Sequence, residues 1–250
     1  MINVLLHGCN GKMGKMISNT AENFSDLKIA AGIDKNANKN FDYPVFEKIC
    51  DCNINCDVIL DFSRPDSLDS LLEYAKKNNL PLILCTTGYT DEQLNKIEKA
   101  SAEIPLFRSA NMSIGINILN NVLKQISAFL YEDFDIEIIE KHHNQKVDAP
   151  SGTALLLGNT IKSSLPSETK FTFGREGTCK RTKDEIGIHA IRGGTIVGEH
   201  DVIFAGKDEI IQLNHTALSR EVFAVGALKA CQFMNGKKTG MYSMDDVIKR

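Results

Sequence analysis

The chain has 250 residues, of which 42% are hydrophobic and 24% charged, and its formal net charge at pH 7 is -3. This length supplies a core for one large domain or two modest ones, and the composition is that of an ordinary globular protein. The acidic balance argues against a nucleic-acid-binding surface, and no apolar run reaches the ~20 residues that a membrane span needs.

The seven cysteines are best interpreted as reduced thiols, because no secretory signal precedes the first apolar run. We therefore expect a cytoplasmic protein. Cys50, Cys52 and Cys56 form a local cluster in "CDCNINC". Their spacing is not that of a zinc site, so the sequence predicts no metal.

In the first half of the chain, short apolar segments alternate with helical segments. The predicted strands are residues 2–7, 27–34, 57–62, 81–88 and 104–107. The predicted helices cover residues 12–24, the segment after Pro65, and residues 91–101. Short continuous apolar strands separated by helices indicate an α/β fold whose parallel, doubly wound sheet is buried on both faces, as in a Rossmann-type domain.

The pattern changes after about residue 113. Helical spacing over residues 116–130 is followed by a half-exposed alternating strand, 134–143, and a helix, 151–165. Three strand-like segments then follow without room for crossover helices: 185–194, 196–204 and 209–215. They predict an α+β domain with an antiparallel or mixed sheet. Residues 220–234 have the pattern of a long helix, with Ser219 as its expected N-cap.

A glycine-rich turn joins the first strand to the first helix. Gly8, Gly11 and Gly14 lie in "HGCNGKMG", and Asp34 ends the next strand twenty residues after Gly14. Glycine lets the backbone approach a diphosphate at a helix N-terminus, and the acid is placed to accept hydrogen bonds from a ribose. Asn10 replaces the usual second glycine and tolerates a left-handed backbone. The alternative is a plain tight turn.

Other polar segments are positioned for the rest of a dinucleotide. Lys12 and Lys35 could approach a 2′-phosphate. "TTG" (86–88) and "SANMS" (109–113) follow two later strands, at the sheet edge where ligands of open α/β sheets bind. Ordinary strand-to-helix turns explain these small residues equally well.

The stretch "KHHNQKVDAPSGTA" (141–154) combines titratable groups with a helix start. After Pro150, residues 151–153 are predicted to offer unpaired backbone amides, together with the hydroxyls of Ser151 and Thr153, as a carboxylate cradle. His142 or His143 could exchange a proton near neutrality, and Lys146 adds positive charge or a second donor. Alternatively, Asp148 and Ser151 cap the helix and His143 packs beneath it.

With its flanking residues, this stretch resembles the signature of the 4-hydroxy-tetrahydrodipicolinate reductase (dihydrodipicolinate reductase) family, E-x-H-H-x-x-K-x-D-x-P-S-G-T-A. The resemblance extends almost end to end, through "GCNGKMG", "DVILDFSRPD", "SANMSIGIN", "IRGGTIVGEHDVIFAG" and "GMYSMDDV". It implies a Rossmann dinucleotide-binding domain of residues 1–113 with 221–250, and a substrate-binding and tetramerisation domain of residues 114–220. The implied partners are a dicarboxylate substrate and identical subunits in a homotetramer.

The implied reaction is NADH- or NADPH-dependent reduction of 4-hydroxy-tetrahydrodipicolinate to tetrahydrodipicolinate, on the path to diaminopimelate and lysine. By position, His142 and Lys146 would be the catalytic pair, and His143, Gly152 and Thr153 would hold the substrate. The implied cofactor contacts are Gly8, Cys9, Asn10, Gly11, Lys12, Met13, Asp34, Lys35, Cys85, Thr86, Thr87, Ser109, Ala110, Asn111 and Met112.

Two positions depart from the family pattern. Cys85 stands where the family commonly has glycine, and Lys35 stands where arginine is frequent. Lysine pairs with a phosphate as a point charge without a guanidinium fork, so use of both cofactors is expected.

Three other functions fit parts of the sequence. Another two-domain Rossmann oxidoreductase of a small amino or oxo acid is the nearest alternative. A non-catalytic dinucleotide sensor is disfavoured by the intact His142 and Lys146 pair. A metallohydrolase is disfavoured because two adjacent histidines lack further ligands at suitable spacing.

Overall fold

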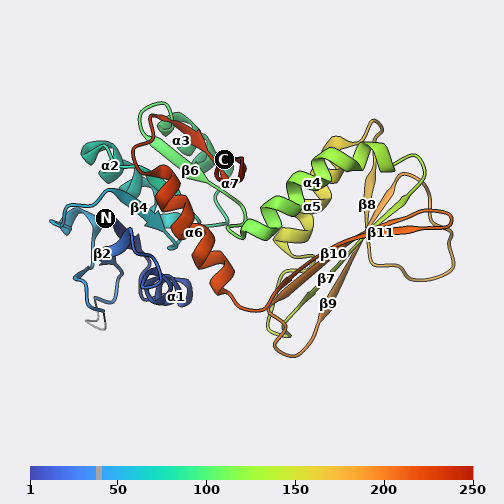
Figure 1. The fold of residues 1–250 in the computed structure, drawn as a ribbon, viewed down its shortest axis with the longest axis horizontal. Helices are drawn as coiled ribbons and strands as arrows, with labels where there is room; N and C mark the ends of the chain where they lie inside the picture. Colours follow the sequence, from blue (N-terminus) through green and yellow to red (C-terminus); the bar gives the residue numbers. More distant parts are fainter. Residues whose placement is uncertain (38–40, 250) are drawn as a thin grey trace. The chain divides into compact units, whose positions relative to one another are not determined.

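The computed structural model describes residues 1–37 and 41–249. The chain divides into two compact units (Figure 1). Unit 1 is Met1–Ile114 with Arg220–Arg250, and unit 2 is Gly115–Ser219.

Unit 1 is built on a seven-stranded sheet in which every strand is parallel to its neighbours. Its order is β12-β6-β5-β4-β1-β2-β3. The strands are β1 (Ile2–His7), β2 (Leu27–Ile33), β3 (Val45–Phe46), β4 (Val58–Asp61), β5 (Leu82–Leu84), β6 (Pro105–Arg108) and β12 (Gly240–Tyr242).

Helices cover both faces of this sheet, because successive strand residues point to opposite sides. The helices are α1 (Lys12–Ala21), α2 (Leu68–Asn78), α3 (Asp91–Ala100), α6 (Glu221–Met234) and α7 (Met244–Ile248), with short 3₁₀ helices η1 (Ile49–Asp51) and η2 (Pro65–Ser67). On β1, Leu6 packs in the core with α1 and α6, whereas Leu5 packs with α2 and α3. The predicted doubly wound sheet is confirmed.

The segment after the second unit returns to unit 1. Helix α6 buries Ala224, Ala227, Leu228 and Cys231 in the first core, and β12 pairs in parallel with β6. The prediction that Ser219 caps this helix is wrong. The N-cap residue is Arg220, and its side chain makes no cap hydrogen bond.

Unit 2 contains a mixed five-stranded sheet, as predicted. Its order is β11-β10-β7-β9-β8, with parallel pairs β7–β9 and β8–β9 and antiparallel pairs β7–β10 and β10–β11. The elements are α4 (Ile114–Leu130), β7 (Asp135–His142), α5 (Gly152–Ser164), β8 (Lys170–Phe173), β9 (Glu185–Arg192), β10 (Gly198–Ala205) and β11 (Ile210–Ala217).

Helices α4 and α5 pack on one face of this sheet. Ile136 and Ile138 of β7 lie in a core with Leu123 of α4 and Leu157 of α5. The alternating burial of β7 places Glu140 and His142 on the same face. The odd-numbered residues of β7, including Glu137, lie on the opposite face.

No described helix is long and apolar enough to cross a membrane. Within residues 1–37 and 41–249, no three or more His, Cys, Asp or Glu side chains are grouped so that they could hold a metal ion. All seven cysteines are free thiols.

Candidate active site

The glycine turn of unit 1 is shaped by close backbone contacts. Gly8 has a φ of +84°, and a Cβ there would lie 2.6 Å from the carbonyl oxygen of Phe62. A Cβ at Gly14 would lie 2.2 Å from the carbonyl oxygen of Gly8. Glycine is therefore required at both positions for β1, β4 and α1 to approach one another. The left-handed conformation falls on Gly8, and Asn10 does not adopt it.

Asp34 lies beside this turn. Its carboxylate accepts hydrogen bonds from the backbone N–H groups of Asn10 and Asn36, both at 3.1 Å. The side-chain amide of Asn10 donates to the carbonyl of Asn36. A carboxylate has about four acceptor sites, so Asp34 can also accept ribose hydroxyls. The adjacent Lys35 ammonium is largely exposed, 3.6 Å from Asp66.

A cavity of about 980 Å³ opens over these residues. Its wall includes Gly8, Asn10, Gly11, Asp34 and Lys35, and it continues past η1 and α2. A volume of this size accommodates a cofactor-sized ligand. The donors of the turn and the acceptor on Asp34 therefore fit the adenosine and diphosphate portion of a nicotinamide dinucleotide.

The other predicted cofactor residues differ in exposure. Cys9 and Met112 are buried in the core, so only their backbone atoms can contact a ligand. Cys85 packs against the same core, and burial raises the pKa of its thiol. The remaining residues are partly or fully exposed: Lys12, Met13, Thr86, Thr87, Ser109, Ala110 and Asn111.

The sequence interpretation missed a buried acid at the carboxyl edge of this sheet. Asp61 is fully buried at the end of β4. It accepts hydrogen bonds from His7 Nδ1 at 2.8 Å and Thr86 Oγ1 at 2.7 Å, and also from Ser63. These contacts tie together the ends of β1, β4 and β5, where the cofactor residues are expected. An acid that ends an apolar strand is the signal that could have identified it.

The second group of predicted residues lies at the end of β7. His142 Nδ1 lies 2.6 Å from Oε2 of the buried Glu140. Burial lowers the pKa of His142, the positive charges of Lys146 and Arg192 lower it further, and Glu140 acts in the opposite direction. The imidazole is therefore neutral at pH 7 in the ligand-free protein.

The predicted carboxylate cradle has partners within the protein. Ser151 is the N-cap of α5, and its hydroxyl accepts from the backbone N–H of Ala154 at 3.1 Å. The prediction of unpaired amides is wrong at Ser151, whose N–H donates to Glu140 at 2.9 Å. The Gly152 N–H faces the carboxylate of Asp148 and helps to lower its pKa.

Lys146 Nζ lies 2.8 Å from Oδ1 of Asp148. Partial burial raises the pKa of Asp148, but hydrogen bonds from Lys146 and Gly152 outweigh it and leave the pKa below its usual value. One internal carboxylate thus joins a lysine and a helix N-terminal amide. The two other predicted substrate residues, His143 and Thr153, are half-buried on either side of this loop.

Three further residues complete this site, and the sequence interpretation did not assign them to it. Glu140 contacts His142 Nδ1, and Arg192 donates to Glu140. His200 packs edge-on against the His142 ring at a centroid distance of 5.1 Å. The spacing of Glu140 and His142, two residues apart on a strand, could have indicated their contact.

The fold and the two groups of residues define a nicotinamide-dependent oxidoreductase. Two family models match the chain: "Dihydrodipicolinate reductase, N-terminus" over residues 2–112 and "Dihydrodipicolinate reductase, C-terminus" over residues 115–248. The chain belongs to the dihydrodipicolinate reductase family, which confirms the resemblance.

Relatives of known name support this assignment. A 4-hydroxy-tetrahydrodipicolinate reductase of Clostridium novyi is 68% identical, covering 100% of this chain and 99% of the relative. One from Clostridium tetani is 62% identical over 98% of this chain and 96% of the relative. Among solved structures, dipicolinate-bound dihydrodipicolinate reductase from Paenisporosarcina sp. TG-14 has a TM-score of 0.82 at 26% identity, over 97% of each chain.

Proposed function

We propose that this chain reduces 4-hydroxy-tetrahydrodipicolinate to tetrahydrodipicolinate with a reduced nicotinamide dinucleotide, in diaminopimelate and lysine biosynthesis. The observation that carries the proposal is the group at the end of β7, where His142 contacts Glu140 and a lysine and a helix N-terminus share one carboxylate. The names of the relatives supply the substrate. Unit 1 is then the dinucleotide-binding domain and unit 2 the substrate-binding and tetramerisation domain.

The proposed substrate is a dicarboxylate, and the contacts of Asp148 support a way of holding one of its carboxylates. The carboxylate of Asp148 pairs with Lys146 Nζ and faces the Gly152 N–H. We propose that a substrate carboxylate takes over these two donors, with Thr153 and His143 completing the contacts. The side chain of Asp148 is 51% exposed, so it can turn into solvent when the substrate binds.

Loss of the 4-hydroxyl group as water leaves a conjugated C=C–C=N system in the substrate ring, and a bound reduced nicotinamide would supply a hydride to its terminal carbon. The neighbouring electron-rich carbon then needs a proton, and His142 is its proposed donor, with Lys146 as the companion. The negative charge of a bound dicarboxylate favours the imidazolium form, so substrate binding would raise the pKa of His142 from its lowered value. Lys146 is the proposed second donor of a proton to the same ring carbon.

We further propose that both NADH and NADPH are used. Asp34 suits the free 2′-hydroxyl of NADH, and the exposed Lys35 ammonium suits the 2′-phosphate of NADPH. The seven free thiols fit a reducing compartment such as the cytoplasm. We also propose a homotetramer assembled through unit 2.

The test is consumption of NADH and NADPH, measured in parallel, with substrate made in situ from pyruvate and aspartate semialdehyde. His142→Gln and Lys146→Ala are each expected to lower kcat by about 10²–10⁴-fold, the usual contribution of a positioned acid. His189→Gln is the matched control, because this histidine pairs with Glu137 on the opposite sheet face. Its rate should stay within a few-fold of wild type.

Lys35→Ala should raise the KM for NADPH and leave the KM for NADH nearly unchanged. Equal effects on both cofactors would contradict the role of Lys35. Absence of turnover with either cofactor, in folded protein that still binds dinucleotide, would sink the reductase assignment and favour a sensor.

A further inference from the structure

We propose that Glu140 is a positioning residue that holds the His142 imidazole in its Nδ1–H tautomer and leaves Nε2 to exchange the proton with substrate. The inference rests on the proposed function and deepens it. It assigns no contact between Glu140 and the substrate, since the carboxylate is fully buried.

The carboxylate of Glu140 is fully engaged. Oε2 accepts from His142 Nδ1 at 2.6 Å and from Arg192 Nη1 at 2.7 Å. Oε1 accepts from Arg192 Nη2 at 2.6 Å and from the Ser151 N–H at 2.9 Å. Four donors fill the acceptor sites of one carboxylate. Arg192 binds it through both terminal nitrogens, which fixes its plane as well as its position.

These contacts determine the tautomer of His142. Burial alone would raise the pKa of Glu140, but the hydrogen bonds from Arg192, His142 and the Ser151 N–H outweigh it, so the pKa is lowered and the group is ionised. An ionised carboxylate can only accept, so Nδ1 must donate. Nε2 then carries the lone pair of the neutral ring, or the proton of the imidazolium.

The surroundings of Nε2 are consistent with this assignment. A Cβ built on Gly198 of β10 would lie 3.1 Å from Nε2, so glycine keeps this side of the ring from being crowded. Arg192 of β9 lies opposite His142 of β7 in the parallel pairing of these strands. Its Nη2 also donates to the backbone carbonyl of Asp148 at 2.7 Å. Arg192 therefore links the histidine support to the loop that carries Lys146.

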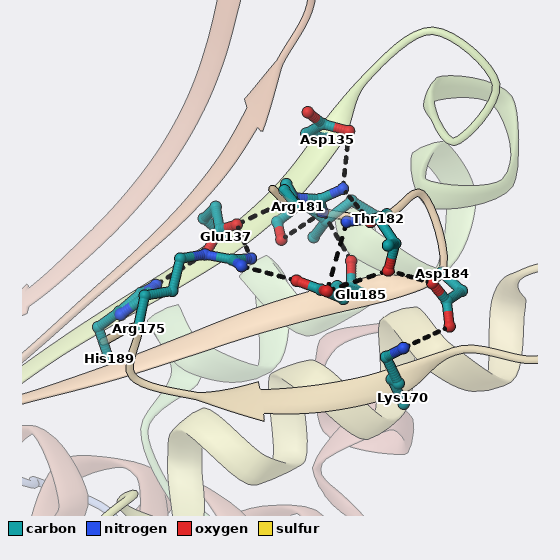
Figure 2. A network of polar contacts seen from close by, with 10 residues as sticks. Asp135, Glu137, Lys170, Arg175, Arg181, Thr182, Asp184, Glu185 and His189 are labelled. Atoms are coloured by element: carbon teal, nitrogen blue, oxygen red, sulfur yellow. Dashed lines mark hydrogen bonds and ion pairs between the residues drawn. The ribbon is translucent and has the colours of Figure 1, made fainter. Parts of the chain in front are cut away.

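The opposite face of the same sheet provides a matched comparison. Glu137, three residues earlier on β7, accepts from His189 Nε2 at 2.7 Å, from Arg175 at 3.0 Å and from Arg181 at 3.1 Å (Figure 2). Like Glu140, it accepts hydrogen bonds from a histidine and from arginine, but its histidine is not next to Lys146 or the start of α5. Replacing Glu137 changes a similar ion-pair network without touching the proposed catalytic pair.

The experiment compares Glu140→Gln, Glu140→Asp and Glu137→Gln with wild type. Ring ¹⁵N NMR of the resting protein reports the tautomer, with the His142 signal assigned by its loss in His142→Gln. Wild type and Glu140→Asp should show the Nδ1–H form. In Glu140→Gln the side-chain amide can donate to Nδ1, so the ring should shift toward Nε2–H.

The kcat of Glu140→Gln should fall by about 10–100-fold, with substrate KM within a few-fold of wild type. Glu140→Asp should recover part of kcat. Glu137→Gln should match wild type, with its mass checked by light scattering because Glu137 lies beside Ile203 on the sheet face opposite α4 and α5.

Two results would overturn the proposal: an Nε2–H tautomer at His142 in wild type, or full kcat in a folded Glu140→Gln variant. The wild-type spectrum tests the tautomer of His142 even if the Glu140→Gln variant does not fold. Wild-type protein that shows the Nδ1–H form but reduces no substrate would remove the proposed function while leaving the role of Glu140 in ring orientation intact.

Discussion

At the residue scale, the histidines of unit 2 have different environments. His200 is buried under α5, with Nε2 3.0 Å from the Ser151 hydroxyl. Burial lowers its pKa to about 3, and the neighbouring His142 lowers it in the same direction. The ring is therefore kept neutral, so it adds no further positive charge beside the proposed proton donor.

This environment makes the free energy of unfolding depend on pH. The unfolded chain protonates His200 below its ordinary pKa of 6.5, whereas the folded chain does not until about 3. Falling pH therefore favours the unfolded state, by about 1.4 kcal/mol per pH unit below 6.5. In urea unfolding, the stability lost by wild type between pH 7 and pH 5 should exceed the loss in His200→Gln by about 2 kcal/mol. Identical losses would mean that His200 is hydrated and titrates normally.

At the element scale, helix α6 lies directly against the segment that carries predicted cofactor residues 109–112. A Cβ on Gly226 would lie 1.8 Å from the carbonyl oxygen of Met112. The helix can approach this closely only because glycine lacks a side chain. The C-terminal segment thus completes the first core and also supports a proposed part of the cofactor site.

Gly226→Ala should push α6 away from Met112. Because the clash is with backbone, we expect a loss of about 1–3 kcal/mol in the free energy of unfolding and weaker NADH binding in a fluorescence titration. Gly158→Ala in α5 is the control. Its new Cβ would lie 3.1 Å from the Phe171 ring, a side chain that can move. Its stability should change less and its NADH affinity should not change; equal losses in both variants would argue against a backbone clash.

At the scale of the whole molecule, we place the proposed subunit contact on the sheet face of unit 2 that lies opposite α4 and α5. It carries Ile139 and Ile203 on neighbouring strands, and Ile210 at 67% exposure on the edge strand. Ion pairs on this face, such as Lys141 with Glu199 at 2.8 Å, give it charged groups beside the apolar ones. Because charged residues are depleted at the core of subunit interfaces, we place the isoleucines at the centre of the proposed contact and the ion pairs around them.

Light scattering should give wild-type protein four times the mass of one chain. Ile203→Lys places a charge in the centre of the proposed contact and should lower that mass. Phe129→Lys is the control, because Phe129 is 86% exposed on α4. A wild-type monomer, or an equal response of both variants, would refute assembly through this face.

Most of the fold follows from local properties of the chain. Hydrophobic spacing and glycine turns predicted five of the seven strands of the first sheet and placed the second domain. The missed strands β3, β8 and β12 have only two to four residues, too few for a period to show. His142, Lys146 and the start of α5 could be identified because they lie within one short segment.

The sequence by itself determined the order of elements, the class of fold and the family motif, because these depend on residues that are neighbours along the chain. Only the tertiary structure decided what surrounds the motif. Arg192 reaches Glu140 across 52 residues because β7 and β9 pair in one register, and Asp61 joins three strand ends because it is buried where they meet. The pairing of β7 with β9 and the meeting of three strand ends at Asp61 are contacts between distant segments, so they could not be read from the spacing of neighbouring residues.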